Sequence, residues 1–296
     1  MPLKEQITKF LSTHGLPPKE RSCDGTYSSI VDGEAYQDLV NSGKIGPNDI
    51  TCQWNCDGMP VFKSSNYSIW PIQIMINECT PSIRKKNIML VALWFGSGKP
   101  RMDSFLTPFV ETCEKLSKEG ISWTDTDGHT ICTKMHMLVC SSDAVARPAL
   151  RHAKQFNGEF GCDWCLNPGV VVPKGDGHVR AYSADHYRIR THEMMVNDAM
   201  EASNSAKCPN GIKGLTPLYL LTMFNMVTGF VPDYLHSVCQ GVMRQFSGLC
   251  LDSQNHRKPW YIGRQMKDLD RRLLKMQPPC EAVSYTHLTL PTICSV

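Results

Sequence analysis

The chain has 296 residues, of which 42% are hydrophobic and 20% are charged, and its formal net charge is +3. This composition is typical of a folded globular protein and excludes a disordered or collagen-like chain. No apolar run reaches the roughly 18 residues that a membrane-spanning helix needs, so we expect no membrane partner. The N-terminus lacks an apolar signal core, so the fourteen cysteines indicate reduced thiols and metal ligands, not a disulfide framework.

The first half of the chain predicts a sheet. Residues 1–48 are polar and are interpreted as an entry segment with one short helix. Residues 50–56 predict the first strand, and the alternation of apolar and polar residues over 72–76 predicts a half-buried second strand. Residues 87–95 are almost continuously apolar, which predicts a central strand covered on both faces.

Two helices and a fourth strand follow. A helix capped by Asp103 or Ser104 should end at Gly120. Met135–Cys140 predicts the fourth strand, and a second helix should run from Ala146 through Phe156. The resulting order, β-β-β-α-β-α, predicts an α/β fold with the mixed sheet of ribonuclease-H-like proteins.

Two aspartates end the first and fourth predicted strands, Asp57 and Asp143. The ribonuclease-H-like order places these strands side by side, so the two carboxylates should converge on a divalent-metal site for phosphodiester chemistry. Either residue alone has a simpler interpretation, because Asp57-Gly58 is a common turn and Asp143 is a good helix N-cap.

Beyond the predicted sheet the pattern becomes helical. An apolar helix is expected over Leu218–Val227, and another should begin at Asp233. We therefore divide the chain into four parts. These are an entry segment (1–48), the N-terminal part of a ribonuclease-H-like core (49–165), a mostly helical insertion linked to the sheet by a structural zinc site (166–282) and a non-native tail (283–296).

A Cys-x-x-Cys pair, Cys162 and Cys165, has the spacing of zinc ligands. The alternative is that they are ordinary cysteines in a cysteine-rich chain. Asp233 and His236 offer a carboxylate and an imidazole that could complete a structural zinc site. The competing ligands are His178, His192 and Cys239.

Four sequence blocks carry a family resemblance: CDGMPVFKSSNYSIWPIQIMINE, LWFGSGKPRMDSFLTPFVE, CSSDAVARPALRHAKQFNGEFGCDWCLNPG and GFVPDYLHSVCQGVMRQF. Together, over roughly residues 50–280, they resemble CACTA-type (En/Spm-like) DDE transposases. The resemblance implies metal-dependent DNA cleavage and strand transfer in the intact protein, and a nuclear location. It implies DNA as the partner, both transposon ends and target, and it is compatible with a homo-oligomer.

The resemblance also implies residue roles. Asp57 and Asp143 match the first two catalytic acids and would hold two Mg²⁺ or Mn²⁺ ions, with Asp57 bridging both. Cys162, Cys165, Asp233 and His236 match the family's zinc-site motifs. The third acid, a glutamate, has no match, and the final segment VSYTHLTLPTICSV resembles translated adapter sequence. The chain is therefore interpreted as a fragment.

DNA backbone contacts are expected from basic side chains, with a solvated surface as the alternative. The candidates are Lys63, Arg84, Lys85, Lys86, Arg147, Arg151 and Lys154. Two other functions compete with the transposase hypothesis. One is a non-catalytic, transposase-derived zinc module that binds DNA or protein. The other is a zinc hydrolase using Cys162, Cys165 and His236, which is disfavoured because no general base accompanies them.

Overall fold

The computed structural model describes residues 2–19, 27, 29–61, 66–183, 185–205 and 207–276. The chain forms two compact units, Met1–Pro232 and Asp233–Val296, and each is described by itself. The boundary falls inside the range 166–282 that was predicted as a helical insertion. The predicted non-native tail, 283–296, lies outside the described residues. Within the described part, no helix is both long and apolar enough to cross a membrane.

The first unit is built on a mixed sheet, as the sequence predicted for an α/β fold. Its neighbours run in the order β4-β3-β1-β7-β10, with β1 antiparallel to β3, β3 antiparallel to β4, and both β1–β7 and β7–β10 parallel. A short β2 continues the pairing of β1 along β3. The strands are β1 (Ile50–Cys56), β2 (Met59–Pro60), β3 (Tyr67–Ile76), β4 (Met89–Ser97), β7 (Met135–Ser142) and β10 (Phe230–Pro232).

One face of this sheet is buried under two helices, α1 (Leu3–His14) and α4 (Met102–Glu119). Alternate residues of β1 point to this face, and Trp54 packs there against Phe109 at 5.2 Å between ring centroids. Leu3, Ile7 and Leu11 of α1 are fully buried in the same core, so the predicted entry segment contributes directly to the fold of this unit.

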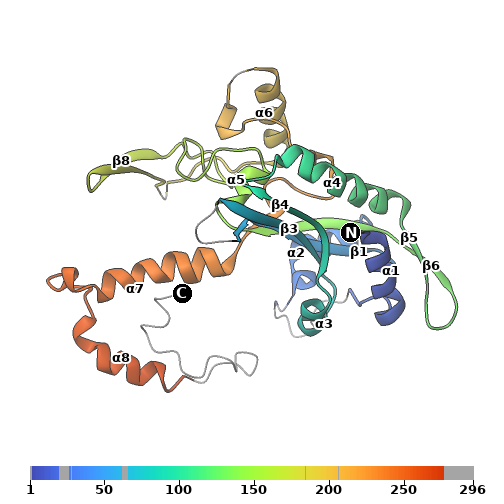
Figure 1. Ribbon diagram of the computed structural model, residues 1–296, viewed down its shortest axis with the longest axis horizontal. Helices are drawn as coiled ribbons and strands as arrows, with labels where there is room; N and C mark the ends of the chain where they lie inside the picture. The colour runs from blue at the N-terminus through green and yellow to red at the C-terminus, as the bar shows by residue number, and fades with distance from the viewer. Residues whose placement is uncertain are drawn as a thin grey trace. The chain divides into compact units, whose positions relative to one another are not determined.

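The opposite face carries a smaller apolar cluster beneath α2 (Glu34–Asn41), built on Tyr36 and on Leu138 of β7. Figure 1 shows α4 and α2 on opposite sides of the sheet. The remaining described helical turns around this region are η1 (Ile30–Asp32) and α3 (Pro81–Lys86). The sheet is therefore covered on both sides near β7.

The prediction that 87–95 forms a doubly covered central strand is wrong. Strand β4 pairs with β3 alone among the described strands. Its outward side chains Leu93 and Phe95 are 56% and 58% exposed. The apolar run was misleading because an edge strand can carry apolar residues on an uncovered face, which periodicity alone does not reveal.

The predicted second helix is much shorter than expected, because α5 covers Ala146–Leu150. At His152 the backbone takes a φ of 53°, outside the helical region. The chain then pairs with a later segment: Lys154 N donates to Gly211 O at 2.8 Å, and Lys213 N donates to His152 O at 2.8 Å. This long-range pairing ends the helix.

The predicted helix 218–227 is also different. A 3-10 turn, η3 (Pro217–Leu220), is followed by turns in which Asn225 Oδ1 accepts hydrogen bonds from Val227 N and Thr228 N at 2.9 and 3.0 Å. Phe224 and Met226 are nevertheless buried. The segment is apolar because it crosses the core, not because it is helical.

Several elements were not predicted. They are the hairpin β5 (Ile121–Thr124) with β6 (Thr130–Thr133), the hairpin β8 (Val170–Lys174) with β9 (Gly177–Ala181), the helix α6 (His192–Asn204) and the turn η2 (Pro209–Gly211).

The second unit is helical in its described part, as predicted for the chain beyond Asp233. Apolar side chains of its first helical stretch, such as Val242 and Phe246, are 50% and 60% exposed. Its elements are η4 (Leu235–Met243, with π-helical hydrogen bonds), α7 (Arg244–Leu251), η5 (Ser253–Asn255), η6 (Gly263–Gln265) and α8 (Met266–Leu273).

Candidate metal sites

The two aspartates follow neighbouring parallel strands. Strand β1 pairs with β7 through Trp54 and Cys140. Ser142 Oγ then donates to Cys56 O at 3.0 Å, across residues 86 positions apart. Asp57 and Asp143 have the same separation (143 − 57) and are the next residues on the two strands. The expectation that their strands lie side by side is confirmed.

Strand alternation, continued one residue past each strand, predicts that the side chains of both aspartates lie on one face of the sheet. Cys52, Trp54 and Cys56 are buried on the core face, whereas Gln53 and Asn55 are half-buried on the other. Continuing this alternation puts Asp57 on the less buried face. On β7, Cys140 and Ser142 are buried and Ser141 is not, so Asp143 continues on that same face. The distance between the two carboxylates stays a prediction.

Each carboxylate also has a local structural role. Asp57 Oδ1 accepts a hydrogen bond from Gly58 N at 2.7 Å. Asp143 Oδ1 accepts from Val145 N at 2.8 Å and from Ala146 N at 2.6 Å, so it caps the turn that leads into α5. These contacts are those of the simpler turn and cap interpretation. Both contacts of Asp143 use Oδ1, so its other oxygen can serve as a ligand.

Two cysteines next to these strand ends belong to the core. Cys56 and Cys140 are fully buried. Burial raises the pKa of the Cys56 thiol well above its ordinary value and that of Cys140 to about 12. Both thiols therefore stay protonated at neutral pH and act as small apolar side chains.

The thiols of Cys162 and Cys165 lie together, with their Sγ atoms 3.3 Å apart. Their loop is held by Arg190, whose Nε donates to Cys162 O at 3.1 Å and to Cys165 O at 3.2 Å. Burial raises the pKa of the Cys165 thiol. Within the described part of the first unit, no third His, Cys, Asp or Glu forms a group with these two thiols.

Asp163, between the two cysteines, joins two buried arginines. Its carboxylate accepts from Arg147 Nε at 2.9 Å and from Arg151 Nη1 at 2.8 Å. Arg147 and Arg151 therefore support the fold and do not present a surface for DNA, which corrects their prediction as backbone contacts. Arg84 is similarly engaged, since its Nη2 donates to Asn77 O at 2.6 Å.

The other basic residues predicted to contact the DNA backbone differ in their exposure to solvent. Lys85 and Lys86 are exposed and Lys154 is half-buried. Lys63 lies outside the described residues.

The predicted zinc partners Asp233 and His236 lie close together in the second unit. His236 Nδ1 is 3.2 Å from Asp233 Oδ2, and His236 N donates to Asp233 Oδ1 at 3.1 Å. Although partial burial raises the pKa of Asp233, these hydrogen bonds outweigh it and lower the pKa. That these two residues join the thiols stays a prediction.

The three competing zinc ligands, His178, His192 and Cys239, lie in different parts of the structure. His192 Nδ1 accepts from Met226 N at 3.1 Å. His178 is exposed on β9, and Cys239 is exposed in the second unit.

A group that the sequence analysis missed lies in the turn of the β5–β6 hairpin, where Asp125, Asp127 and His129 have ligand atoms within 4.8 Å of one another. The signal was the run Asp-Thr-Asp-Gly-His. Asp125 Oδ1 accepts from His129 N at 2.8 Å and from Asp127 N at 3.0 Å, and these contacts lower its pKa. The group stabilises an exposed turn through its own hydrogen bonds.

The acids that follow His236 are engaged elsewhere. Asp252 caps η5 by accepting from Gln254 N at 2.9 Å, and Asp268 pairs with Arg271 at 2.6 Å. Asp270 lies in α8, and Glu281 falls outside the described residues. None of the described acids matches the third acid that the family resemblance implies.

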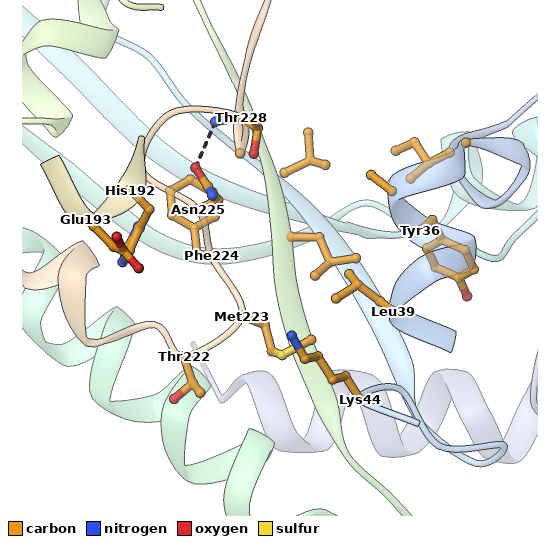
Figure 2. Close-up of a pocket in the computed structure, with 16 residues that line it drawn as sticks. Tyr36, Leu39, Lys44, His192, Glu193, Thr222, Met223, Phe224, Asn225 and Thr228 are labelled. Carbon is orange, nitrogen blue, oxygen red and sulfur yellow. Dashed lines mark hydrogen bonds between the residues drawn. The ribbon is translucent and has the colours of Figure 1, made fainter. Parts of the chain in front are cut away.

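A groove of about 530 Å³ lies between α2, β7 and the segment 222–229. Figure 2 shows its apolar side chains, including Leu39, Met223 and Phe224, with Asn225 bonded to Thr228 at one edge. Its rim carries Lys44, His192 and Glu193. The two aspartates do not line this groove.

Comparison with known proteins adds no assignment. A scan against protein-family models and a search of curated proteins found no match for this chain.

Proposed function

We propose that this chain is part of the catalytic core of a ribonuclease-H-like DDE transposase, related to the CACTA type, which cleaves DNA and transfers strands in the intact protein. The strand order supports the proposal. Three antiparallel strands, β4, β3 and β1, are followed by β7 and β10 in parallel with β1. This is the order expected for a ribonuclease-H-like sheet.

The observation that carries the proposal is the position of Asp57 and Asp143. They come directly after Cys56 and Ser142, which are joined by a 3.0 Å hydrogen bond across parallel strands. Neighbouring strands lie about 4.8 Å apart, and alternation continued one residue past each strand would direct both side chains to one face. Two carboxylates so placed fit a divalent cation that prefers oxygen ligands.

The chemistry follows from these ligands. When bound, two Mg²⁺ or Mn²⁺ ions would activate a water or a DNA 3′-hydroxyl and stabilise the leaving oxygen. Asp57 would contribute to both ions and Asp143 to one. The backbone amides of Val145 and Ala146 hold the Asp143 carboxylate in place through Oδ1.

Zinc at Cys162 and Cys165 is the second part of the proposal. Two thiols 3.3 Å apart in a loop held by Arg190 fit a soft, tetrahedral ion. By the sequence resemblance, Asp233 and His236 are the remaining ligands in this proposal. Metal analysis of the purified chain should find about one zinc per chain, lost in Cys162→Ser. Full zinc retention in that variant contradicts the site.

DNA is the proposed partner, with transposon ends and target DNA as substrates in the nucleus and with a homo-oligomer as the assembly. Among the predicted basic contacts, Lys85 and Lys86 at the end of α3 are exposed and therefore accessible to a phosphate backbone.

The carboxylate site is tested by Mn²⁺ binding, measured by electron paramagnetic resonance on the whole chain. Asp57→Asn and Asp143→Asn should each weaken Mn²⁺ binding by about tenfold or more, since each removes one charged ligand. Asp143→Asn is the informative variant, because asparagine is as good an N-cap as aspartate. If Asp143 is a cap alone, this variant will bind Mn²⁺ like the wild type, and the proposal fails.

A second candidate function is a non-catalytic, transposase-derived zinc module that binds DNA or protein. It is favoured by the local roles of both aspartates and by the absence of a matching third acid among the described residues. It predicts zinc binding without Mn²⁺ binding, so the same measurements separate the two functions.

A further inference from the structure

A continuous chain of contacts connects the thiol loop to the residues before the two aspartates. Asp163, inside the Cys-x-x-Cys loop, accepts from Arg147 Nε at 2.9 Å. Nη1 of the same arginine donates to Ser142 O at 2.8 Å. Ser142 Oγ in turn donates to Cys56 O at 3.0 Å. Three hydrogen bonds thus join the loop to both strand ends.

Arg147 is the central member of this chain. Its side chain is 5% exposed. Its guanidinium also lies 5.4 Å from the ring centroid of Trp164, the other residue between the two cysteines. Arg147 therefore contacts both residues between the two cysteines, Asp163 and Trp164, and also donates a hydrogen bond to Ser142 at the end of β7. Lysine could not replace it, because a single ammonium lacks the planar, forked donors that reach two acceptors at once.

The loop has a second anchor on its far side. Arg190 donates to the carbonyls of Cys162 and Cys165, and Arg190 N donates to Trp164 O at 2.9 Å. Arg151 also binds Asp163: its Nη1 donates to the carboxylate, and its Nη2 donates to Asp163 O at 3.1 Å. The loop is therefore held by Arg190, Arg151 and Arg147, and of these three Arg147 also contacts the end of β7.

We propose that Arg147 and Asp163 are positioning residues that couple the metal-binding loop to the Asp143 carboxylate. A metal ion bound by Cys162 and Cys165 fixes the loop, and the Asp163–Arg147–Ser142 contacts then order the end of β7. Asp143 is kept in its capping geometry by this route. The inference rests on the proposed zinc at the thiols, and it assigns a function to two residues that neither metal site uses as ligands.

The structure supplies a direct reporter of the Asp143 position. The amides of Val145 and Ala146 donate to Asp143 Oδ1, so their hydrogen exchange is slow while the carboxylate stays in place. Exchange is measured by mass spectrometry on the whole chain, zinc-loaded and after treatment with a zinc chelator. The proteins are wild type, Cys162→Ser, Arg147→Lys and the double variant, with the exposed Arg188→Lys as the matched control.

Zinc removal should speed exchange at Val145 and Ala146 by about fivefold or more in the wild type and in Arg188→Lys, the lower end of typical coupling between sites. Cys162→Ser should show the same acceleration without zinc removal. In Arg147→Lys the exchange should already be fast and should not respond further to zinc or to Cys162→Ser. A peptide from α1 should exchange at the same rate in all five proteins, which separates this coupling from general loosening.

Three results overturn the inference: an unchanged zinc response in Arg147→Lys, no zinc response in the wild type, or equal acceleration in α1. Should Arg147→Lys unfold, Asp163→Glu replaces it, because it keeps the charge but lengthens the link, and the same outcomes apply. Mn²⁺ binding is recorded on the same samples. If Mn²⁺ does not bind but the zinc-dependent exchange is found, the catalytic proposal fails and the coupling stands.

Discussion

Replacing Asp163 by asparagine tests the buried charge cluster of the first unit. The substitution preserves shape and removes the negative charge shared by Arg147 and Arg151, whose side chains are 5% and 2% exposed. The amide can still accept from one arginine, but its NH₂ group then faces a donor of the other. Two guanidinium groups would stay buried without a charge partner in contact.

The size of the effect follows from this burial. Breaking a buried ion pair by removing one partner costs about 3–5 kcal/mol, because the charge that is left behind is poorly solvated. For a unit of this size, 1 kcal/mol corresponds to roughly 2–4 °C in Tm, so the melting temperature should fall by about 6–20 °C. The side chain of Asp163 is 14% exposed, so water offers little compensation.

The measurement is thermal and urea denaturation followed by circular dichroism. The matched control is Asp176→Asn, which makes the same chemical change in the exposed turn between β8 and β9. It should change the free energy of unfolding by about 0.5 kcal/mol or less. A Tm for Asp163→Asn within about 2 °C of the wild type would refute the reasoning, since at 2–4 °C per kcal/mol it implies that the arginines are solvated or otherwise paired.

Three further predictions follow from single residues. Burial lowers the pKa of His136, although the nearby Asp49 carboxylate acts to raise it. The neutral imidazole therefore contributes folding stability that is present above about pH 6.5, the ordinary histidine pKa, and is lost as pH falls through the lower pKa of the folded state. The drop in Tm between pH 7.5 and 5.5 should therefore be smaller in His136→Asn, and an equal drop would contradict this. Gly58→Ala should lower stability by about 1–3 kcal/mol in urea denaturation, because the new Cβ would lie 2.5 Å from the buried Trp70 ring; a neutral result would mean that Trp70 moves aside. Given Mg²⁺ and DNA, the chain should show no cleavage on a gel, because no described acid matches the third acid that the proposed transposase site would need, and robust cleavage abolished by Asp57→Ala would disprove that.

Local sequence patterns located the four longest strands of the sheet. The alternation in Ile72–Ile76 and the run before Asp57 correspond to β3 and β1, and Met135–Cys140 corresponds to β7. These predictions succeeded because a strand with one buried face must repeat every second residue. The α4 helix was predicted for a related reason, since its buried residues Leu106, Phe109 and Cys113 follow the helical period.

The failures share a different cause. The helix predicted through Phe156 ends at Leu150 because the chain turns at His152 to pair with residues around Gly211. The run 218–227 is apolar because it is buried under distant elements. In both places the local pattern was compatible with a helix, and contacts with residues distant in the sequence decided otherwise.

The sequence by itself determined which residue types could do chemistry: two aspartates at strand ends and two thiols at ligand spacing. It did so because strand ends and short spacings are local properties. Tertiary structure alone decided the register between β1 and β7, which brings Asp57 and Asp143 to matching positions. It also decided that Arg147 and Arg151 are buried around Asp163, because burial depends on which distant surfaces pack together, and no local pattern distinguishes a buried arginine from an exposed one.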